Sequence, residues 1–209
     1  MAARLGPRSA IRRRGTCAAR PGDRRGVGVT TPPAVVIETE RLTLRHLCAD
    51  DAPFILGLLN EPSFLEFIGD KGVRTLDGAR DYIAGQVRSY ERLGFGLYLT
   101  VRRNDDVPIG ICGLVKRDAL SDVDLGFAFR PPFWSRGYAF ESSEAVLQHA
   151  TGPLGLAQVV AIADPGNVSS IRLLEKLGFR SIGPVRLVPD GPELKLFSLR
   201  PQAVGLQSR

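Results

Sequence analysis

The chain has 209 residues, enough for one ordinary domain and a tail, and its hydrophobic content of 44% is that of a protein with a buried core. No apolar run is long enough to span a membrane, so no membrane partner is expected. Residues 1–34 hold eight arginines and one acid; the rest of the chain carries 20 basic and 21 acidic residues. The net charge of +6 therefore belongs to the tail, and the remainder, at −1, argues against a nucleic-acid-binding fold.

Residues 1–34 are rich in Arg, Ala, Gly and Pro and lack apolar periodicity, so we expect a disordered tail. Three interpretations of this tail are open: a transit peptide, a nucleic-acid-binding arm, or an unstructured leader that includes a start assigned too early. The folded domain is expected over 35–200, and 201–209 is expected to be a second, short tail.

The three cysteines, Cys17, Cys48 and Cys112, lie far apart and form no CxxC pair. This spacing does not match a zinc site, and no other metal site is expected. An odd number of scattered cysteines fits a reducing compartment, so we expect a cytoplasmic protein.

Hydrophobic periodicity predicts strands and helices in mixed order along the domain. Seven strands are expected, at 35–47, 95–102, 108–115, 121–129, 157–163, 181–188 and 194–199. Four helices are expected, at 51–60, from 75 or 77 to 93, at 137–150 and at 167–177. Asp50 is expected to cap the first helix and Gly94 to end the second. This order predicts an α/β fold, with a mixed sheet and helices on both of its faces.

The most informative segment follows the strand at 121–129 and reads Phe133-Trp134-Ser135-Arg136-Gly137-Tyr138-Ala139-Phe140-Glu141. A loop between a strand and a helix directs several backbone N–H groups to one point, where the positive end of the helix dipole reinforces them. Small residues at 137 and 139 let a phosphate approach the backbone, so the loop is predicted to bind a diphosphate. It has neither the Walker pattern nor the GxGxxG pattern. An ordinary strand-to-helix turn is the alternative.

This segment resembles the pyrophosphate loop of the GNAT superfamily of N-acetyltransferases, in particular the RimJ/RimL-like branch with its W-x-x-G-Y-A-x-E pattern. Three further segments resemble that branch in order and spacing. They are the first strand at 38–45, the strand at 122–127 that leads into the loop, and the helix at 167–179. The resemblance covers roughly 36–200 and implies the GNAT acyl-CoA N-acyltransferase fold, in which a splay separates the fourth and fifth of about seven strands.

The resemblance implies acetyl-CoA as a co-substrate, with its diphosphate on the backbone N–H groups of residues 134–139 and its pantetheine arm between the strands at 121–129 and 157–163. The expected cofactor-binding residues are Phe127, Trp134, Ser135, Arg136, Gly137, Tyr138, Ala139, Asn167 and Ser170. Gly126 is a suitable place for a bulge that parts the strands. Capping of its own helix is a second role for Asn167, and exposure to solvent is the alternative for Arg136.

Two residues depart from the usual family pattern. Phe140 stands where many members have a threonine that bonds a phosphate. Leu174 stands where many have a tyrosine that protonates the leaving thiolate, so the general acid is unassigned, although the RimJ-like branch often lacks this tyrosine.

Asp124 occupies the place where relatives carry an acidic residue beside the thioester, so we expect it to be the general base, directly or through water. A structural or substrate-orienting carboxylate is the alternative. The resemblance implies acetyl transfer to a primary amine of a small molecule or a protein N-terminus, with a homodimer left open. The alternative functions are a non-catalytic CoA-binding regulatory module and a ribosome- or RNA-associated protein that uses the basic tail.

Overall fold

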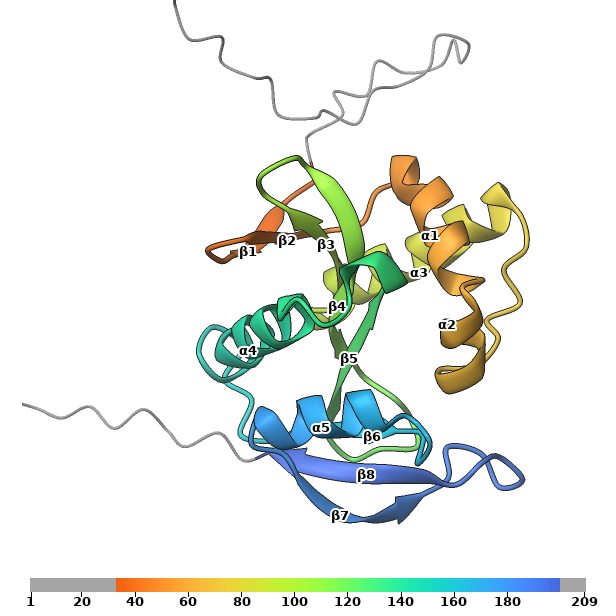
Figure 1. Ribbon diagram of the computed structural model, residues 1–209, viewed down its shortest axis with the longest axis vertical. Coiled ribbons are helices and arrows are strands. Elements are labelled where there is room, and N and C mark those ends of the chain that lie inside the picture. Colours follow the sequence, from red (N-terminus) through yellow and green to blue (C-terminus); the bar gives the residue numbers. More distant parts are fainter. Residues whose placement is uncertain (1–32, 200–209) are drawn as a thin grey trace, which may run out of the picture. The chain divides into compact units, whose positions relative to one another are not determined.

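The computed structural model describes residues 33–199, which form one mixed sheet with helices on both of its faces (Figure 1). The predicted tails at 1–34 and 201–209 lie outside the described residues, except for Pro33 and Ala34. The strands are β1 (Val35–Glu38), β2 (Leu42–Arg45), β3 (Leu97–Arg102), β4 (Val107–Val115), β5 (Val123–Phe129), β6 (Val159–Ala163), β7 (Arg180–Val185) and β8 (Leu194–Leu199). The helices are η1 (Ala49–Asp51), α1 (Ala52–Leu59), α2 (Pro62–Phe67), α3 (Leu76–Leu93), η2 (Pro131–Phe133), α4 (Tyr138–Thr151) and α5 (Val168–Lys176).

The strands follow the order β1-β2-β3-β4-β5-β6-β8-β7 across the sheet. Neighbouring strands are antiparallel except β5 and β6, which pair in parallel. Parallel neighbours need a crossover connection, and α4 supplies it between these two strands. The predicted α/β class, a mixed sheet with helices on both faces, is confirmed.

The predicted strand at 35–47 is a hairpin of two strands, β1 and β2. Thr39 closes its turn: the Thr39 amide donates to the carbonyl of Leu42, and the Thr39 hydroxyl accepts from the amide of Leu42 at 3.0 Å. A threonine hydroxyl that bonds the backbone locally competes with the strand ladder and favours a turn. Within residues 33–199 the sheet therefore has eight strands, where about seven were expected.

The start of the first helix also differs from the prediction. The turn η1 precedes α1, and the residue at the helix cap is Asp51, not Asp50. The carboxylate of Asp51 accepts two bonds from Arg45 at 2.8 Å and one from the amide of Cys48. Its acceptor capacity is thus used by a neighbouring strand and turn, and it makes no side-chain cap of α1.

Hydrophobic periodicity did not predict α2, but it located α3 well. The missed helix, α2, has only six residues, too few for an apolar period to repeat, although Pro62 at its start is typical of a helix N-terminus. The ends of α3 agree with the prediction, because Thr75 accepts from the amide of Gly78 and Gly94 adopts a left-handed conformation. No helix within residues 33–199 is both long and apolar enough to cross a bilayer.

Alternate residues of the central strands pack against different helices. Tyr98 of β3 and Cys112 of β4 belong to an apolar cluster that includes α4, whereas Leu99 and Ile111 belong to one that includes α1 and α3. Because a strand directs successive side chains to opposite faces, each face of the sheet has its own core. This two-sided packing holds the centre of the sheet, including β5, in place.

The strands β5 and β6 part after two residue pairs. They pair at Val123↔Val159 and Asp124↔Val160, and no later residue of β5 pairs with β6. β6 instead stays with β8 over its whole length, whereas β5 stays with β4 as far as Phe129. The expected splay is therefore present. The bulge expected at Gly126 was wrong, because the β4–β5 ladder runs in unbroken register there.

Candidate active site

The loop between β5 and α4 contains two residues with a left-handed backbone, Ser135 (φ 57°) and Gly137 (φ 80°). Glycine adopts this conformation readily, whereas at serine it costs about 1–2 kcal/mol. Left-handed residues at such a turn direct nearby N–H groups toward one side and form a concavity that binds anions. The strained serine therefore contributes to a shape that suits an anion.

The amides of residues 135–140 donate to no acceptor within the described part of the chain. The amide of Glu141 donates to the carbonyl of Gly137 at 3.0 Å and so begins the hydrogen-bond pattern of α4. Unpaired amides at a helix N-terminus and the helix dipole together attract a negative group. The loop thus offers an unbroken row of donors, as the sequence predicts.

Trp134 is the exception to the predicted row. Its amide donates to the carbonyl of Pro131 at 3.1 Å, and its indole N–H donates to the carbonyl of Phe129 at 2.6 Å. The turn η2 already engages this main-chain donor, and the predicted contact of Trp134 with the diphosphate stays a prediction. The row of free donors begins at Ser135.

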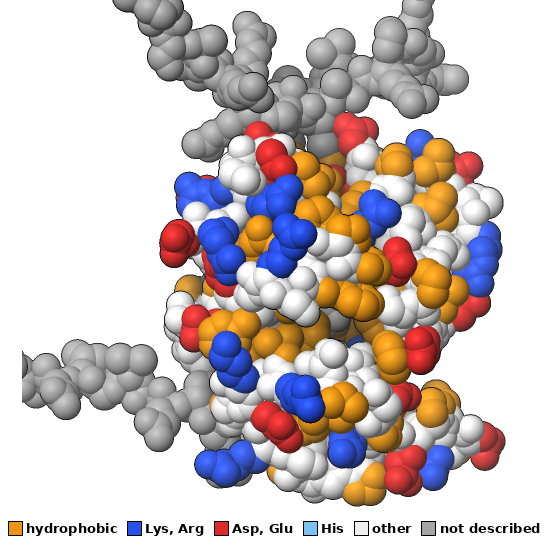
Figure 2. Space-filling model, viewed as in Figure 1, with side chains coloured by type: hydrophobic (Ala, Val, Ile, Leu, Met, Phe, Trp, Pro, Cys, Tyr) orange, Lys and Arg blue, Asp and Glu red, His pale blue; other side chains and the backbone are white. Residues whose placement is uncertain are grey.

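The loop borders a cleft of about 510 Å³ that residues of α1, α2, β5 and α5 also line. The cleft brings together every predicted cofactor-binding residue except Arg136, namely Phe127, Trp134, Ser135, Gly137, Tyr138, Ala139, Asn167 and Ser170. Figure 2 shows hydrophobic side chains in a hollow across the middle of this face, with Lys and Arg side chains around it. Arg172 and Lys176 of α5 are the basic residues of the lining. An anionic ligand with an apolar segment suits such a cleft.

The start of α5 contributes Asn167 and Ser170. The side-chain oxygen of Asn167 accepts from the amide of Ser170 at 3.0 Å, so Asn167 does cap its helix. The hydroxyl of Ser170 bonds no other described residue and borders the cleft, where it is available to a ligand. Arg136 is exposed and lies outside the lining, so its predicted contact with the cofactor stays a prediction.

Asp124 lies at the apex of the splay, in the last residue pair before β5 and β6 part. Its side chain is 1% exposed, and its Oδ2 accepts from Nε of Arg117 at 2.6 Å. No hydrogen bond of ordinary geometry reaches Oδ1 within residues 33–199, although the backbone of Ile162 lies near enough to lower the pKa of this carboxyl. Burial raises the pKa of Asp124 to about 6, and Arg117 limits that rise. A buried carboxylate with one unpartnered oxygen and a pKa near neutrality suits proton transfer.

Asp124 and the loop lie at opposite ends of β5. Asp124 does not itself line the cleft, and Phe127, the first residue of β5 that does, follows three residues later, about 10 Å along the strand. The positive charge of Arg117 also acts on the phenol of Tyr82 in α3. Burial raises the pKa of Tyr82 to about 12, and the charge of Arg117 opposes this rise. No group of three or more His, Cys, Asp or Glu in the described residues is placed to hold a metal ion.

Three parts of the site were not predicted from the sequence. Phe64 and Phe67 of α2 form part of the cleft wall, and Pro62 was the available sign of that helix. Arg117 bonds Asp124 from the loop between β4 and β5, and no pattern indicates which side chain of that loop turns inward. Arg41 and Glu141 both lie in the segments that resemble the family, but their mutual contact appears only in the folded chain.

Known proteins resemble this chain in sequence and in fold. Residues 41–180 match the model of the acetyltransferase (GNAT) domain. The uncharacterized N-acetyltransferase p20 of Bacillus licheniformis is 28% identical over 150 residues, which cover 71% of this chain and 84% of p20. Ribosomal-protein-S5-alanine acetyltransferase from Vibrio fischeri has a TM-score of 0.67 at 18% identity, over 80% of this chain and 97% of that structure. RimL, a ribosomal L7/L12 α-N-protein acetyltransferase in complex with coenzyme A, has a TM-score of 0.68 at 16% identity, over 80% and 98%.

Proposed function

This chain belongs to the GNAT acetyltransferase family, and on that premise we propose that it transfers the acetyl group of acetyl-CoA to a primary amine of a protein N-terminus or a small molecule. The observation that carries the proposal is the row of amides at residues 135–140, which have no acceptor within residues 33–199, beside a cleft lined by the part of β5 that no longer pairs with β6. A diphosphate is the anion that such a row of donors holds well.

The residues of the cleft fit coenzyme A. The amides of the loop would hold the diphosphate, with Arg172 and Lys176 adding positive charge nearby. Phe127 and the unpaired edge of β5 would border the pantetheine arm, and Ser170 would offer it a hydroxyl. Acetyl-CoA supplies the acyl group as a thioester, whose thiolate is a tolerable leaving group. The likeness to RimL, which was solved with coenzyme A, supports this placement of the ligand.

Asp124 would act as the general base at the apex of the splay. In the transfer, the amine nitrogen bonds to the acetyl carbon, the carbon–sulfur bond breaks, and the amine proton passes to Asp124 directly or through one water. Oδ1, the unpartnered oxygen, is the atom that would accept this proton. Arg117 keeps the other oxygen occupied and holds the carboxylate in its charged form at neutral pH. Amides near Gly126 and Phe127 would stabilise the charge on the thioester oxygen.

The acceptor would enter from the side of α1 and α2. Leu58, Phe64 and Phe67 make this wall largely apolar, with Glu61 as its acidic residue. An amine next to a hydrophobic surface, such as the N-terminus of a peptide, suits this wall better than a polycation does. The likeness to ribosomal-protein acetyltransferases agrees with a peptide acceptor.

An amine panel tests the proposal. The full chain is incubated with acetyl-CoA and with N-terminal peptides or small primary amines, and released CoA and acetylated product are measured by thiol titration and mass spectrometry. CoA release that depends on the amine is the expected result. Calorimetric binding of CoA without turnover on any amine would favour the non-catalytic module, and no binding of CoA would overturn the proposal altogether.

A further inference from the structure

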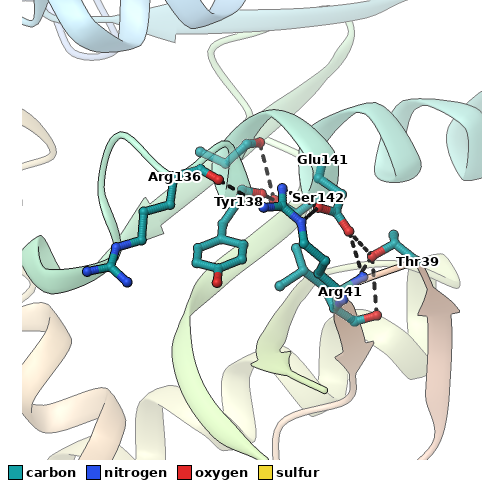
Figure 3. A network of polar contacts seen from close by, with 8 residues as sticks. Thr39, Arg41, Arg136, Tyr138, Glu141 and Ser142 are labelled. Carbon is teal, nitrogen blue, oxygen red and sulfur yellow. Dashed lines mark hydrogen bonds and ion pairs between the residues drawn. The ribbon is translucent and has the colours of Figure 1, made fainter. Parts of the chain in front are cut away.

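Two segments far apart in the sequence meet beside the cofactor loop (Figure 3). Thr39 and Arg41 come from the turn between β1 and β2, and Glu141 comes from the first turn of α4. One oxygen of Glu141 accepts from the Thr39 hydroxyl at 2.5 Å and from the Arg41 amide at 3.0 Å. Its other oxygen accepts from the Arg41 guanidinium at 2.6 Å. Both oxygens of the carboxylate are therefore held by the hairpin.

The same guanidinium fixes one peptide unit of the loop. Nη1 of Arg41 donates to the carbonyl of Arg136 at 3.1 Å. In a trans peptide the carbonyl and the next N–H point in opposite directions, so this bond turns the N–H of Gly137 to the side away from Arg41. Figure 3 shows the side chain of Arg136 directed away from Arg41, so the contact involves only the main chain of that residue.

Arg41 acts from outside the cofactor cleft. It lines a separate groove with residues of β1 and α4, and it is not among the residues that line the cleft. Its Cζ lies 4.8 Å from the ring centroid of Tyr138, and its Nη2 would lie 3.3 Å from a Cβ added at Gly137. The guanidinium thus packs against Gly137 and Tyr138, the two residues at which α4 begins.

Glu141 without a partner would oppose an anion at this helix end. Its carboxylate lies in the first turn of α4, next to the loop that borders the cleft, and like charges at short range repel. Burial tends to raise the pKa of Glu141, but the bonds from Thr39 and Arg41 outweigh it, so the pKa lies below its usual value. The ion pair with Arg41 balances this permanent negative charge.

We propose that Thr39, Arg41 and Glu141 form a positioning clamp, which holds the main chain of the loop in its anion-binding shape without touching the cofactor. The clamp rests on the proposed binding of acetyl-CoA. It gives Arg41 and Glu141 a role in cofactor affinity and none in the chemical step, so their substitution changes the binding of CoA and leaves the rate at saturation unchanged.

Three variants test the clamp by calorimetry with CoA and by steady-state kinetics. Arg41→Met should weaken the Kd of CoA and raise the KM of acetyl-CoA about tenfold, while kcat and the KM of the amine stay within about twofold. Arg41→Lys keeps the charge but cannot bridge carboxylate and carbonyl, so it should recover only part of the affinity. Adding Glu141→Gln to Arg41→Met should also recover part, because the unpaired carboxylate is removed.

Arg186→Met is the matched control, since Arg186 also bridges a backbone carbonyl, that of Gly191, and a carboxylate, that of Glu193, in the loop between β7 and β8. It should leave the Kd of CoA within twofold. A folded Arg41→Met that binds CoA as tightly as the wild type overturns the clamp, and so do equal losses in kcat and in both KM values. If Arg41→Met does not fold, Glu141→Gln and Thr39→Val are measured in its place with the same criteria. A wild type that does not bind CoA overturns the proposed function instead.

Discussion

The two ends of β5 carry two different kinds of site. At the end of the strand, the loop offers main-chain amides whose direction depends on the left-handed backbone of Ser135 and Gly137. At its start, Asp124 offers one buried carboxylate whose pKa depends on burial and on Arg117. The first site depends on backbone shape and the second on a single functional group. Substitutions that keep the backbone should therefore matter little at the loop, whereas any loss of the carboxylate should matter greatly at the apex.

Asp124→Asn should have the largest effect, because it removes the proton acceptor while keeping the side-chain volume. We expect kcat to fall about 100-fold or more, with the Kd of CoA unchanged. Steady-state kinetics between pH 6 and 9, together with calorimetry, measure both quantities. Asp122→Asn makes the same change at a half-buried carboxylate just before β5, so it is the matched control and should keep nearly full activity. Full kcat/KM in Asp124→Asn over this pH range would show that the base is assigned wrongly.

The same variant should be at least as stable as the wild type above pH 6. Because the pKa of Asp124 is raised from 3.8 to about 6, the native state holds more protons than the unfolded state between these values, so the wild type loses stability as the pH rises through this window. This rise corresponds to about 3 kcal/mol, which Asn avoids in part. Denaturant unfolding at pH 4 and pH 7.5 measures the free energy of unfolding of both proteins. If Asp124→Asn were more stable than the wild type only at pH 4, the raised pKa would be contradicted.

Gly137→Ala should have the next largest effect, at the other end of β5. A side chain disfavours φ near 80°, and the added Cβ would lie 3.3 Å from Nη2 of Arg41, so the loop must shift. We expect the Kd of CoA to weaken about 20-fold, with kcat nearly unchanged. Gly155→Ala is the control, because Gly155 also has a positive φ (62°) but no atom within 4 Å of the added Cβ. Equal CoA affinity in the two variants would show that CoA binding does not depend on the backbone conformation of the loop.

Arg117→Met should change the pH dependence more than the maximal rate. The guanidinium lowers the pKa of Asp124, so its loss should raise that pKa further and move the acidic limb of kcat/KM about one unit higher. Activity should fall about tenfold near pH 6 and recover near pH 9, because the carboxylate is ionised again at high pH. Arg117→Lys keeps the charge and should restore most of the profile. A uniform loss at all pH values would instead indicate that Arg117 binds the acceptor.

The sequence identifies features that short segments encode and misses those that distant segments create. The loop was predictable because small residues at 137 and 139 stand between a strand and a helix pattern, and the splay followed from the family resemblance. The bond between Arg41 and Glu141 joins residues 100 positions apart, so no local pattern indicates it. Likewise, the pairing of Arg117 with Asp124 depends on how the loop after β4 folds back.

Local sequence patterns gave a wrong structure where one pattern fits two conformations. Alternation over 35–47 fits one strand or a tight hairpin, and only the bonds of Thr39 to Leu42 decide between them. The amide of Trp134 looked free because it precedes the helix, yet the prolines of η2 form a turn that engages it. In both cases a hydrogen bond between residues three positions apart determined the local structure, and hydrophobic periodicity does not indicate such a bond.

Phe140→Thr should have the smallest effect and gives the sharpest test of a main-chain site. Phe140 lines the cleft, and Nζ of Lys176 lies 4.4 Å from the centroid of its ring. Threonine adds one hydroxyl donor to the loop but loses this cation–π contact, and each is worth about 0.5–1.5 kcal/mol, so the two changes offset each other and the Kd of CoA should change by less than about sixfold. Phe140→Ala, which loses the ring without gaining a hydroxyl, separates the two contributions by calorimetry. If threonine strengthens CoA binding more than tenfold, side chains dominate this loop as they do the apex, and the contrast between the two ends of β5 does not hold.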